Sequence, residues 1–191
     1  MKNKVPFVGR SNVGKSSTIK ALTGMNLRVG KRPGVTRQCK EVPYGRSTLL
    51  DMPGFGFMAG LSTSRQEEIK KFVVQFLENS NDLAFAVQVI DIKSFASISD
   101  RWISRGYEPV DIEMYHFLKE LDLNPLLLAN KIDKIPLGKR DGVLDRVADL
   151  LGVDESLHNF EIIPYSAKTG ESISYLKKVL NLKINQNINQ I

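Results

Sequence analysis

Short runs of apolar and β-branched residues alternate along this chain with segments whose apolar residues recur every three or four positions. Runs of the first kind are typical of buried β-strands, and segments of the second kind are typical of amphipathic helices. Six strand-like runs cover residues 5–8, 39–44, 47–51, 83–91, 125–130 and 160–165. Because helical segments separate most of them, we predict an α/β fold with a mostly parallel sheet and helices on both faces.

One helix is indicated before the second strand, and another after the third strand. Residues 16–24 directly follow the first strand, and Gly24 is a residue type that commonly closes a helix. A longer helix carries an apolar stripe at helical spacing, made of Ile69, Phe72, Val73, Phe76 and Leu77. A capping box from Ser64 to Glu67 predicts where this helix begins.

Two further helices are indicated in the last third of the chain. The first has apolar residues at the same spacing, at Val143, Leu144, Val147, Leu150 and Leu151. The last covers residues 172–184, and the polar, low-complexity residues 185–191 form a tail that we expect to fray. We therefore predict one domain over residues 1–184.

The segment from Lys93 to Val110 does not fit the alternation. It is longer than a usual connection and contains Arg101, Trp102, Arg105 and Tyr107. Basic and aromatic side chains in one loop can stack on bases and bind phosphates, but a tryptophan can equally anchor the loop on the domain. We favour the anchoring interpretation.

The composition fits one domain with a full-sized core, since the 191 residues are 42% hydrophobic and 25% charged. The single cysteine, Cys39, cannot form an internal disulfide, and we interpret it as structural. No apolar run approaches the roughly 20 residues of a membrane span, and no signal peptide is evident. We expect a cytoplasmic protein, monomeric and without a membrane partner.

The net charge of +6 is unevenly distributed. Residues 1–46 hold eleven lysines and arginines against one acid, Glu41, so the rest of the chain is net negative. One nucleotide cannot account for all the basic residues of this region, which include Arg28, Lys31, Arg32, Arg37, Lys40 and Arg46. A polyanionic partner such as RNA is one explanation, and an ordinary solvated basic face is the other.

The stretch GRSNVGKSST, which begins at Gly9, has the spacing of a phosphate-binding loop. Backbone N–H groups of such a loop surround a phosphate, and the helix that follows presents its positive end. Strand, loop and helix occur here in the required order. The predicted nucleotide-binding residues of this loop are Gly9, Arg10, Ser11, Asn12, Val13, Gly14, Lys15, Ser16 and Ser17.

Four short motifs follow in the order that suits a guanine nucleotide. RPGVTRQ contributes Gly34, Val35 and Thr36, and DMPG contributes Asp51, Met52, Pro53 and Gly54. NKID contributes Asn130, Lys131 and Asp133, and SAK contributes Ser166, Ala167 and Lys168. Three of these motifs end predicted strands, which is where open α/β sheets bind ligands.

The phosphate end of the nucleotide needs positive charge. We expect Lys15 to neutralise the β and γ phosphates and Ser16 to ligate Mg²⁺. Thr36 would complete the magnesium shell when a γ phosphate is present, Asp51 would hold the metal through water, and the Gly54 N–H would face the γ phosphate.

The base end needs groups that distinguish guanine from adenine. The Asp133 carboxylate can accept hydrogen bonds from guanine N1–H and the 2-amino group, whereas adenine has neither donor. Asn130 can reach N7, the Ala167 N–H can meet O6, and the stems of Lys131 and Lys168 can lie against the purine. Asp133 could instead be only a helix N-cap.

These motifs resemble one family in particular. The combination of FVGRSNVGKSS, RPGVT, DMPGFGFM and NKIDK is similar to the EngB group of translation-factor-related P-loop GTPases. The resemblance implies a Ras-like fold with a six-stranded sheet and a role in assembling the large ribosomal subunit. The short N-terminus, the segment from Lys93 to Val110, and the NKID and SAKTG motifs suggest an archaeal-type member.

Turnover is expected to be slow, because Phe55 stands where many switch GTPases have a glutamine that orients the attacking water. Arg32 and Arg37 could assist in cis. Asn12 could hold a K⁺ ion, because potassium-activated relatives that resemble this chain use an asparagine at this position as a ligand of the ion.

We predict a slow GTPase that is accelerated on its partner. The alternative is a nucleotide-gated binding module with little hydrolysis, and an ATP-dependent enzyme is disfavoured by NKID.

Overall fold

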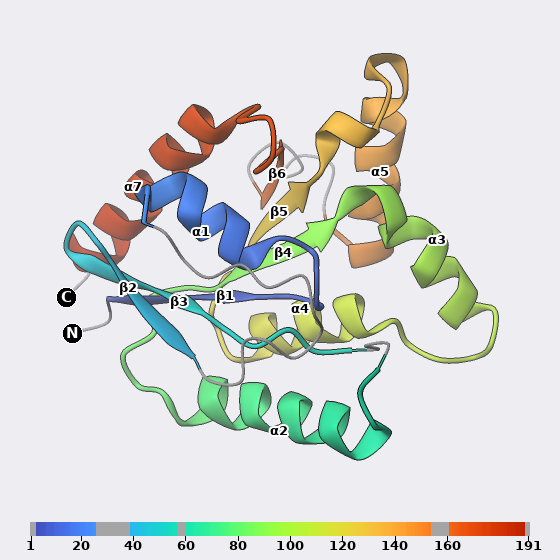
Figure 1. The fold of residues 1–191 in the computed structure, drawn as a ribbon, viewed down its shortest axis with the longest axis horizontal. Coiled ribbons are helices and arrows are strands. Elements are labelled where there is room, and N and C mark those ends of the chain that lie inside the picture. The colour runs from blue at the N-terminus through green and yellow to red at the C-terminus, as the bar shows by residue number, and fades with distance from the viewer. Residues whose placement is uncertain (1–2, 26–38, 57–59, 154–160, 190–191) are drawn as a thin grey trace.

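The computed structural model describes residues 3–25, 39–56, 60–153 and 161–189 of the chain (Figure 1). Its sheet has the strand order β2-β3-β1-β4-β5-β6. Five strands are parallel, and only the edge strand β2 runs antiparallel to its neighbour. The six-stranded, mostly parallel sheet predicted from the sequence is confirmed. The strand bounds are β1 Lys4–Val8, β2 Lys40–Tyr44, β3 Ser47–Asp51, β4 Val87–Asp91, β5 Leu126–Asn130 and β6 Ile162–Tyr165.

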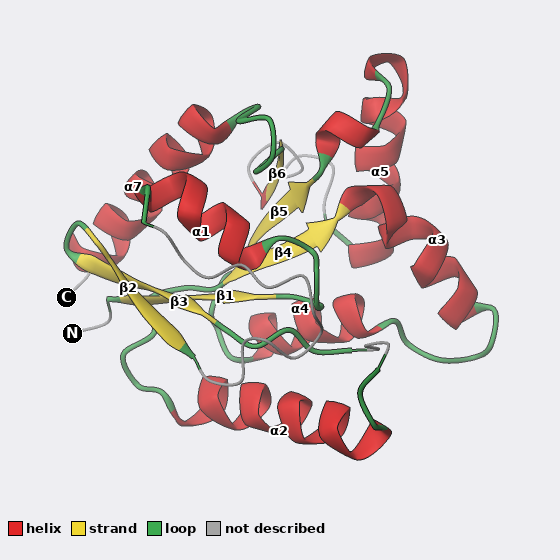
Figure 2. Ribbon diagram, in the orientation of Figure 1, coloured by secondary structure: helices red, strands yellow, loops and turns green. Residues whose placement is uncertain are grey.

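Helices cover both faces of the sheet (Figure 2). On one face lie α1 (Lys15–Thr23) and α7 (Ile173–Asn189). On the other lie α2 (Thr63–Asn79), α3 (Ile92–Ile103), α4 (Val110–Glu120) and α5 (Arg140–Leu151). Two short 3₁₀ turns, Ile132–Lys134 and Leu137–Lys139, connect β5 to α5.

The strands are apolar on both sides because both faces of the sheet are covered. In β5, Leu126 and Leu128 pack under α1 and α7, whereas Leu127 and Ala129 pack under α3 to α5. Each fully buried leucine side chain contributes about 1.5–3 kcal/mol to folding. The apolar side chains packed on the two faces hold the sheet in place. The carboxyl ends of β1, β4 and β5 lie on a common edge.

Two helix ends differ from the sequence prediction. The helix α2 begins after Ser62, whose hydroxyl accepts a hydrogen bond from the Arg65 backbone N–H at 3.3 Å, so the capping box predicted from Ser64 is wrong. The helix α7 continues to Asn189, beyond the predicted end at residue 184. Polar residues have enough helix propensity to extend a helix that is already nucleated.

The segment from Lys93 to Val110 is mostly helical, so the prediction of a long connection is wrong. Its first part is α3, which buries Ile92, Phe95 and Ser99 at helical spacing. Phe95 is fully buried and anchors the segment, whereas Trp102 is 39% exposed. The anchoring role proposed for the tryptophan therefore belongs to Phe95.

Cys39 lies directly before β2 and is half-buried. Burial raises the pKa of its thiol to about 11, which disfavours the reactive thiolate and agrees with a structural role. Within the described ranges, the structure contains no helix whose length and apolar character would let it cross a bilayer.

Candidate functional site

The loop between β1 and α1 has the close backbone packing that its two glycines allow. Gly14 has φ 109°, and a Cβ atom added to it would lie 2.2 Å from Nδ2 of Asn130. Gly9 has φ 143°, and a Cβ there would lie 2.3 Å from the Val89 carbonyl oxygen. Side chains at either position would collide with β4 or β5, so the loop requires glycine at both.

Lys15 is folded across this loop. Its Nζ donates hydrogen bonds to the carbonyl oxygens of Gly9 at 2.8 Å and of Arg10 at 3.0 Å. Burial lowers the pKa of Lys15 to about 8, although the charges of Asp51 and Asp111 favour the ammonium form. The loop thus encloses a cation that phosphate oxygens could bind in place of these carbonyls.

Ser16 and Asp51 meet at the end of β3. The Ser16 hydroxyl donates to Oδ2 of Asp51 at 2.6 Å. Asp51 is 1% exposed, burial raises the pKa of its carboxyl, and its Oδ1 has no hydrogen-bond partner among the described residues. A hydroxyl and an unpartnered carboxylate oxygen are ligand types that Mg²⁺ prefers.

The protein supplies few metal ligands at this place. Within the described part of the chain, no group of three or more histidine, cysteine and acidic side chains could hold an ion. Magnesium in nucleotide sites is usually bound by one or two protein groups together with phosphate oxygens and water. Ser16 and Asp51 fit that kind of site.

The DMPG loop lies against the phosphate loop. A Cβ on Gly54 would lie 2.7 Å from the Ser11 Cα, and the Ser11 N–H donates to the Phe55 carbonyl at 3.3 Å. The Phe55 and Met52 side chains are fully buried in the core under α2 and α4. Met52 was predicted to bind the nucleotide, but its side chain faces the core. Phe55 offers no group that could orient water.

Asn130 connects the two halves of the site. Its Nδ2 donates to the Val13 carbonyl at 2.8 Å, and its Oδ1 accepts from the Lys131 N–H at 2.8 Å and the Ala167 N–H at 3.1 Å. Asn130 is 4% exposed. One amide therefore joins the phosphate loop, NKID and SAK, which are far apart in sequence. Contacts of Asn130 and Ala167 with a purine stay predictions.

Asp133 and Ser166 form the second contact between NKID and SAK. The Ser166 hydroxyl donates to Oδ1 of Asp133 at 2.7 Å, and this bond holds the pKa of the Asp133 carboxyl below its usual range. The Thr169 N–H in turn donates to the Ser166 hydroxyl at 3.1 Å. Asp133 is thus an oriented, ionised acceptor. Lys168, two residues after Ser166, is exposed.

Lys131 is positioned by Asp91, which belongs to none of the sequence motifs. Its Nζ bonds Oδ2 of Asp91 at 2.6 Å and the Asn12 carbonyl at 3.0 Å. Asp91 ends β4 as Asp51 ends β3, so its position at the end of a strand was a usable signal. The ion pair fixes the lysine stem over the phosphate loop.

Arg10 makes a second contact that was missed. Its Nε lies 2.6 Å from Oδ2 of Asp111, at the start of α4. Asp111 is 3% exposed, and burial raises the pKa of its carboxyl despite the nearby guanidinium. Because the Arg10 side chain is committed to this pair, it would contribute to a nucleotide site through its backbone.

Several predicted residues lie outside the described ranges. They are Gly34, Val35 and Thr36 of the RPGVTRQ motif, and the basic residues Arg28, Lys31, Arg32 and Arg37. Lys40 and Arg46 of the basic region are described, and they belong to the hairpin formed by β2 and β3.

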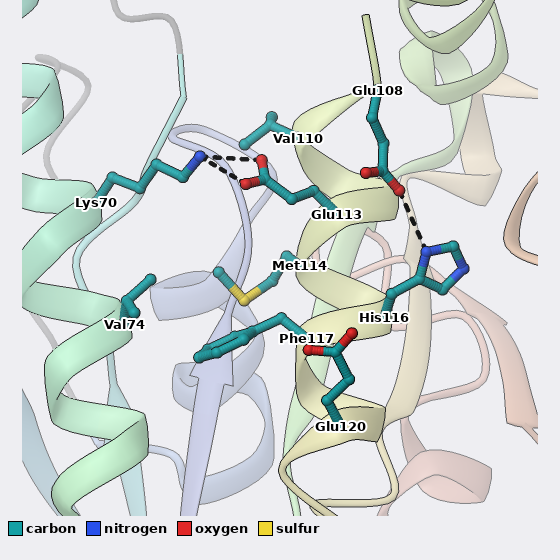
Figure 3. A pocket seen from close by; sticks show the side chains of 9 residues that line it. All are labelled: Lys70, Val74, Glu108, Val110, Glu113, Met114, His116, Phe117 and Glu120. Atoms are coloured by element: carbon teal, nitrogen blue, oxygen red, sulfur yellow. Dashed lines mark hydrogen bonds and ion pairs between the residues drawn. The ribbon is translucent and has the colours of Figure 1, made fainter.

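A hollow of about 380 Å³ lies between α2 and α4, apart from the loops described above (Figure 3). Its apolar lining consists of Val74, Val110, Met114 and Phe117. At its rim Lys70 binds both carboxylate oxygens of Glu113, at 2.8 and 3.0 Å. None of its lining residues belongs to a nucleotide motif.

Comparison with known proteins agrees with the geometry of the loops. Residues 4–131 match the family described as "50S ribosome-binding GTPase". The chain is 42% identical over 187 residues to a probable GTP-binding protein EngB of Methanococcus maripaludis, which covers 95% of this chain and 80% of that protein.

Solved structures give the same result. A crystal structure of a probable GTP-binding protein EngB superposes with a TM-score of 0.86 at 38% identity, covering 96% of this chain and 99% of that one. Era in complex with MgGDPNP and a segment of 16S ribosomal RNA superposes with a TM-score of 0.66 at 25% identity. That match covers 93% of this chain and 55% of the Era chain. With five motifs in order and relatives that match along nearly the whole sequence, the chain belongs to the EngB family of P-loop GTPases.

Proposed function

We propose that this protein is a slow GTPase switch that acts in assembly of the large ribosomal subunit. The observation that carries the proposal is the Asn130 side chain, which holds the phosphate loop, NKID and SAK in one site. Groups suited to phosphate, Mg²⁺ and guanine are thereby brought to one edge of the sheet. The proposed domain remains residues 1–184.

The phosphate end would be bound by Lys15, Ser16 and the backbone of the loop. Lys15 would exchange the carbonyls of Gly9 and Arg10 for phosphate oxygens, which are stronger acceptors for an ammonium group. Ser16 and Asp51 would hold Mg²⁺, with Thr36 as a further ligand. When bound, Mg²⁺ neutralises charge that develops on the phosphate oxygens.

Guanine would be selected by Asp133. Its carboxylate is ionised and keeps one oxygen, Oδ2, beyond the Ser166 bond, with Lys134 at 3.8 Å. An adenine in the same place would leave this acceptor without a donor, which is costly in a partly desolvated site.

Hydrolysis is proposed to be slow without an activator. Intrinsic Ras-type rates are about 10⁻⁴ to 10⁻³ per second, and the buried Phe55 supplies no replacement for a water-orienting side chain. A module that merely binds its partner when GTP is present is the alternative. Lys15, Ser16, Thr36 and Asp51 are all present in the sequence, which weighs against a dead site and favours the enzyme.

Asn12 is the proposed K⁺ ligand. It is exposed, with φ 65°, and its backbone carbonyl faces Lys131. Under this proposal GTP hydrolysis is faster in K⁺ than in Na⁺ at equal ionic strength, and Asn12→Ala removes the difference without weakening nucleotide binding. Equal rates in the two salts would leave Asn12 as a loop residue.

The ribosomal partner is proposed from the family description and from the basic N-terminal region. The Era structure shows a related fold together with ribosomal RNA. We propose that Lys31, Arg32 and neighbouring basic residues contact RNA in the GTP state, in a monomeric, cytoplasmic protein.

The test combines sedimentation with single-turnover kinetics. Purified large subunits are mixed with the protein in a GTP analogue, in GDP and without nucleotide, and hydrolysis is followed with and without subunits. The proposal expects binding favoured by one nucleotide state and faster hydrolysis on subunits. Ser16→Ala should lose both effects, and Ser174→Ala, an exposed hydroxyl on α7, should keep them. State-independent binding without acceleration would support the binding module.

A further inference from the structure

The end of α3 and the turn after it form an exposed surface, which we call the α3 tip (Arg101, Trp102, Ile103, Arg105 and Tyr107). Every residue from 100 to 108 is exposed. Trp102, Ile103 and Tyr107 are 39%, 49% and 62% exposed. Only eight large hydrophobic side chains are exposed among the described residues, so three within six positions is a marked cluster.

Residues outside the tip hold α3 in place. The helix is fixed by its buried Ile92 and Phe95, and by an ion pair at 2.7 Å between Asp100 and Arg146 of α5. The tip is therefore presented by a helix that is held at other positions, and each of its three apolar residues leaves more than a third of its surface exposed.

The turn after α3 brings two aromatic rings together. Gly106 has φ 78°, and the Tyr107 N–H returns to the Trp102 carbonyl at 3.1 Å. The two rings meet edge to face, with centroids 5.9 Å apart and an interplanar angle of 79°. Trp102 is 39% and Tyr107 is 62% exposed, and nucleic acid bases stack on exposed aromatic side chains of this kind.

Two arginines, Arg101 and Arg105, are close to the aromatic residues in sequence, and both are exposed. Among the described residues, neither Arg101 nor Arg105 forms an ion pair. Of the nearby acids, Asp100 is paired with Arg146, and Glu108 lies 3.2 Å from the His116 ring. An anionic partner would therefore meet unpaired guanidinium groups beside exposed rings. This combination is complementary to a strand that carries both phosphates and unstacked bases.

We propose that the α3 tip binds single-stranded RNA, whose bases stack on Trp102 and Tyr107 and whose phosphates pair with Arg101 and Arg105. The proposal deepens the proposed function, on which it rests for ribosomal RNA as the source of the strand. Its place in the fold fits this role. α3 starts at the end of β4, beside the Lys131–Asp91 pair, and extends away from the sheet (Figure 1). Its twelve residues make the helix roughly 18 Å long, so about that length of helix separates the tip from the Lys131–Asp91 pair.

Trp102 is the only tryptophan of the chain, so its fluorescence reports directly on the tip. The probe is a 12-nucleotide oligoadenylate, which should quench the emission to saturation. Binding of a labelled oligoadenylate, followed by anisotropy, should weaken between about fivefold and a hundredfold in Trp102→Ala. Trp102→Phe should recover part of the loss, and Tyr175→Ala, an aromatic residue 51% exposed on α7, should bind as the unaltered protein does.

Charge and stacking are separated by two further measurements. Arg101→Ala together with Arg105→Ala should reduce the slope of log affinity against log salt by ~1.4, for two lost phosphate contacts with a single strand. Heparin carries charge but no bases. Trp102→Ala should therefore leave heparin binding unchanged, whereas the double arginine variant should weaken it.

Absence of quenching, or equal losses in Trp102→Ala and Tyr175→Ala, would overturn the proposal. A photo-crosslinker can also be placed at position 102 and activated in the complex with ribosomal subunits. If it crosslinks only to protein and not to RNA, the tip binds a protein partner and the RNA proposal is overturned. Circular dichroism and GDP affinity confirm that each variant is folded. The two proposals can fail separately. If the protein sediments with subunits but does not bind oligoadenylate, only the proposal for the α3 tip is refuted. If it binds oligoadenylate but does not associate with subunits, only the ribosomal role is refuted.

Discussion

The two ends of the nucleotide site are prepared to different degrees. At the base end, Asp133 and Asn130 are oriented by protein partners and an acceptor oxygen remains available to a ligand. At the phosphate end, Lys15 binds its own loop and Ser16 binds Asp51, so these groups must exchange partners when a nucleotide arrives. In the proposed site, nucleotide identity would thus be set by a preformed surface, whereas binding of phosphate and metal would require rearrangement of local hydrogen bonds.

The largest effect on nucleotide binding is expected from a substitution at the base end of the site. Asp133→Asn removes the charge that is proposed to accept two hydrogen bonds from guanine, each worth about 1.5–3 kcal/mol when one partner is ionised. GTP affinity should fall by about 10²–10⁴-fold, and xanthosine triphosphate should bind better than it does to the unaltered protein. Competition against a fluorescent GDP analogue measures both. Asp141→Asn, an exposed carboxylate on α5, is the control, and unchanged GTP affinity in Asp133→Asn would remove the assignment.

Breaking the junction between the two ends should have the next largest effect. The methyl group of Gly14→Ala would collide with Asn130 at a backbone conformation that disfavours side chains. We expect a loss of about 1–3 kcal/mol in the free energy of unfolding and at least about tenfold in GDP affinity. Urea denaturation and GDP titration give the two values. Gly138→Ala is the matched control, because a Cβ there has no atom within 4 Å. Equal stability of the two variants would contradict the steric explanation.

A smaller effect is expected from loosening Lys131. Asp91→Asn removes the ion pair but keeps a good helix N-cap for α3, so the fold should be retained. The loss in GDP affinity should be about fivefold, as expected for a partly exposed pair worth about 1 kcal/mol. Asp145→Asn on α5 should change nothing. A loss of stability without a loss of affinity would mean that Asp91 serves the helix alone.

The smallest effect concerns the proton on Lys15. In the free protein its pKa is about 8, and bound phosphates should raise it again, so GDP binding takes up a proton where the free lysine is partly neutral. Calorimetry in phosphate and Tris buffers should show uptake of about half a proton at pH 8 and almost none at pH 6.5. From pH 7.5 to 8.5 the affinity should fall about threefold. Buffer-independent enthalpies at pH 8 would contradict this linkage.

The sequence was sufficient for the parts of the fold that depend on local pattern. The strand ends at Asp51 and Asn130 were placed correctly, because apolar runs and motif spacing are both local. The contact of Asn130 with Val13 was not foreseeable, since it joins residues 117 positions apart and leaves no periodic trace. The helix α3 was missed although Ile92, Phe95 and Ser99 have helical spacing, because its exposed aromatic and basic end resembles a loop. Ser62 and Ser64 are chemically equal as caps, and only tertiary packing selects between them.

The Arg10–Asp111 pair restricts how the sequence of this protein can change over time. Asp111 is 3% exposed and Arg10 17% exposed, so loss of either partner leaves a largely desolvated charge, at a cost of about 3–5 kcal/mol. Replacement of both by apolar residues of similar size is far less costly. Each route between these two solutions passes through an intermediate that folds poorly. Substitutions at positions 10 and 111 should therefore be accepted together in descendants of this sequence, and a lineage that holds the ion pair should rarely leave it.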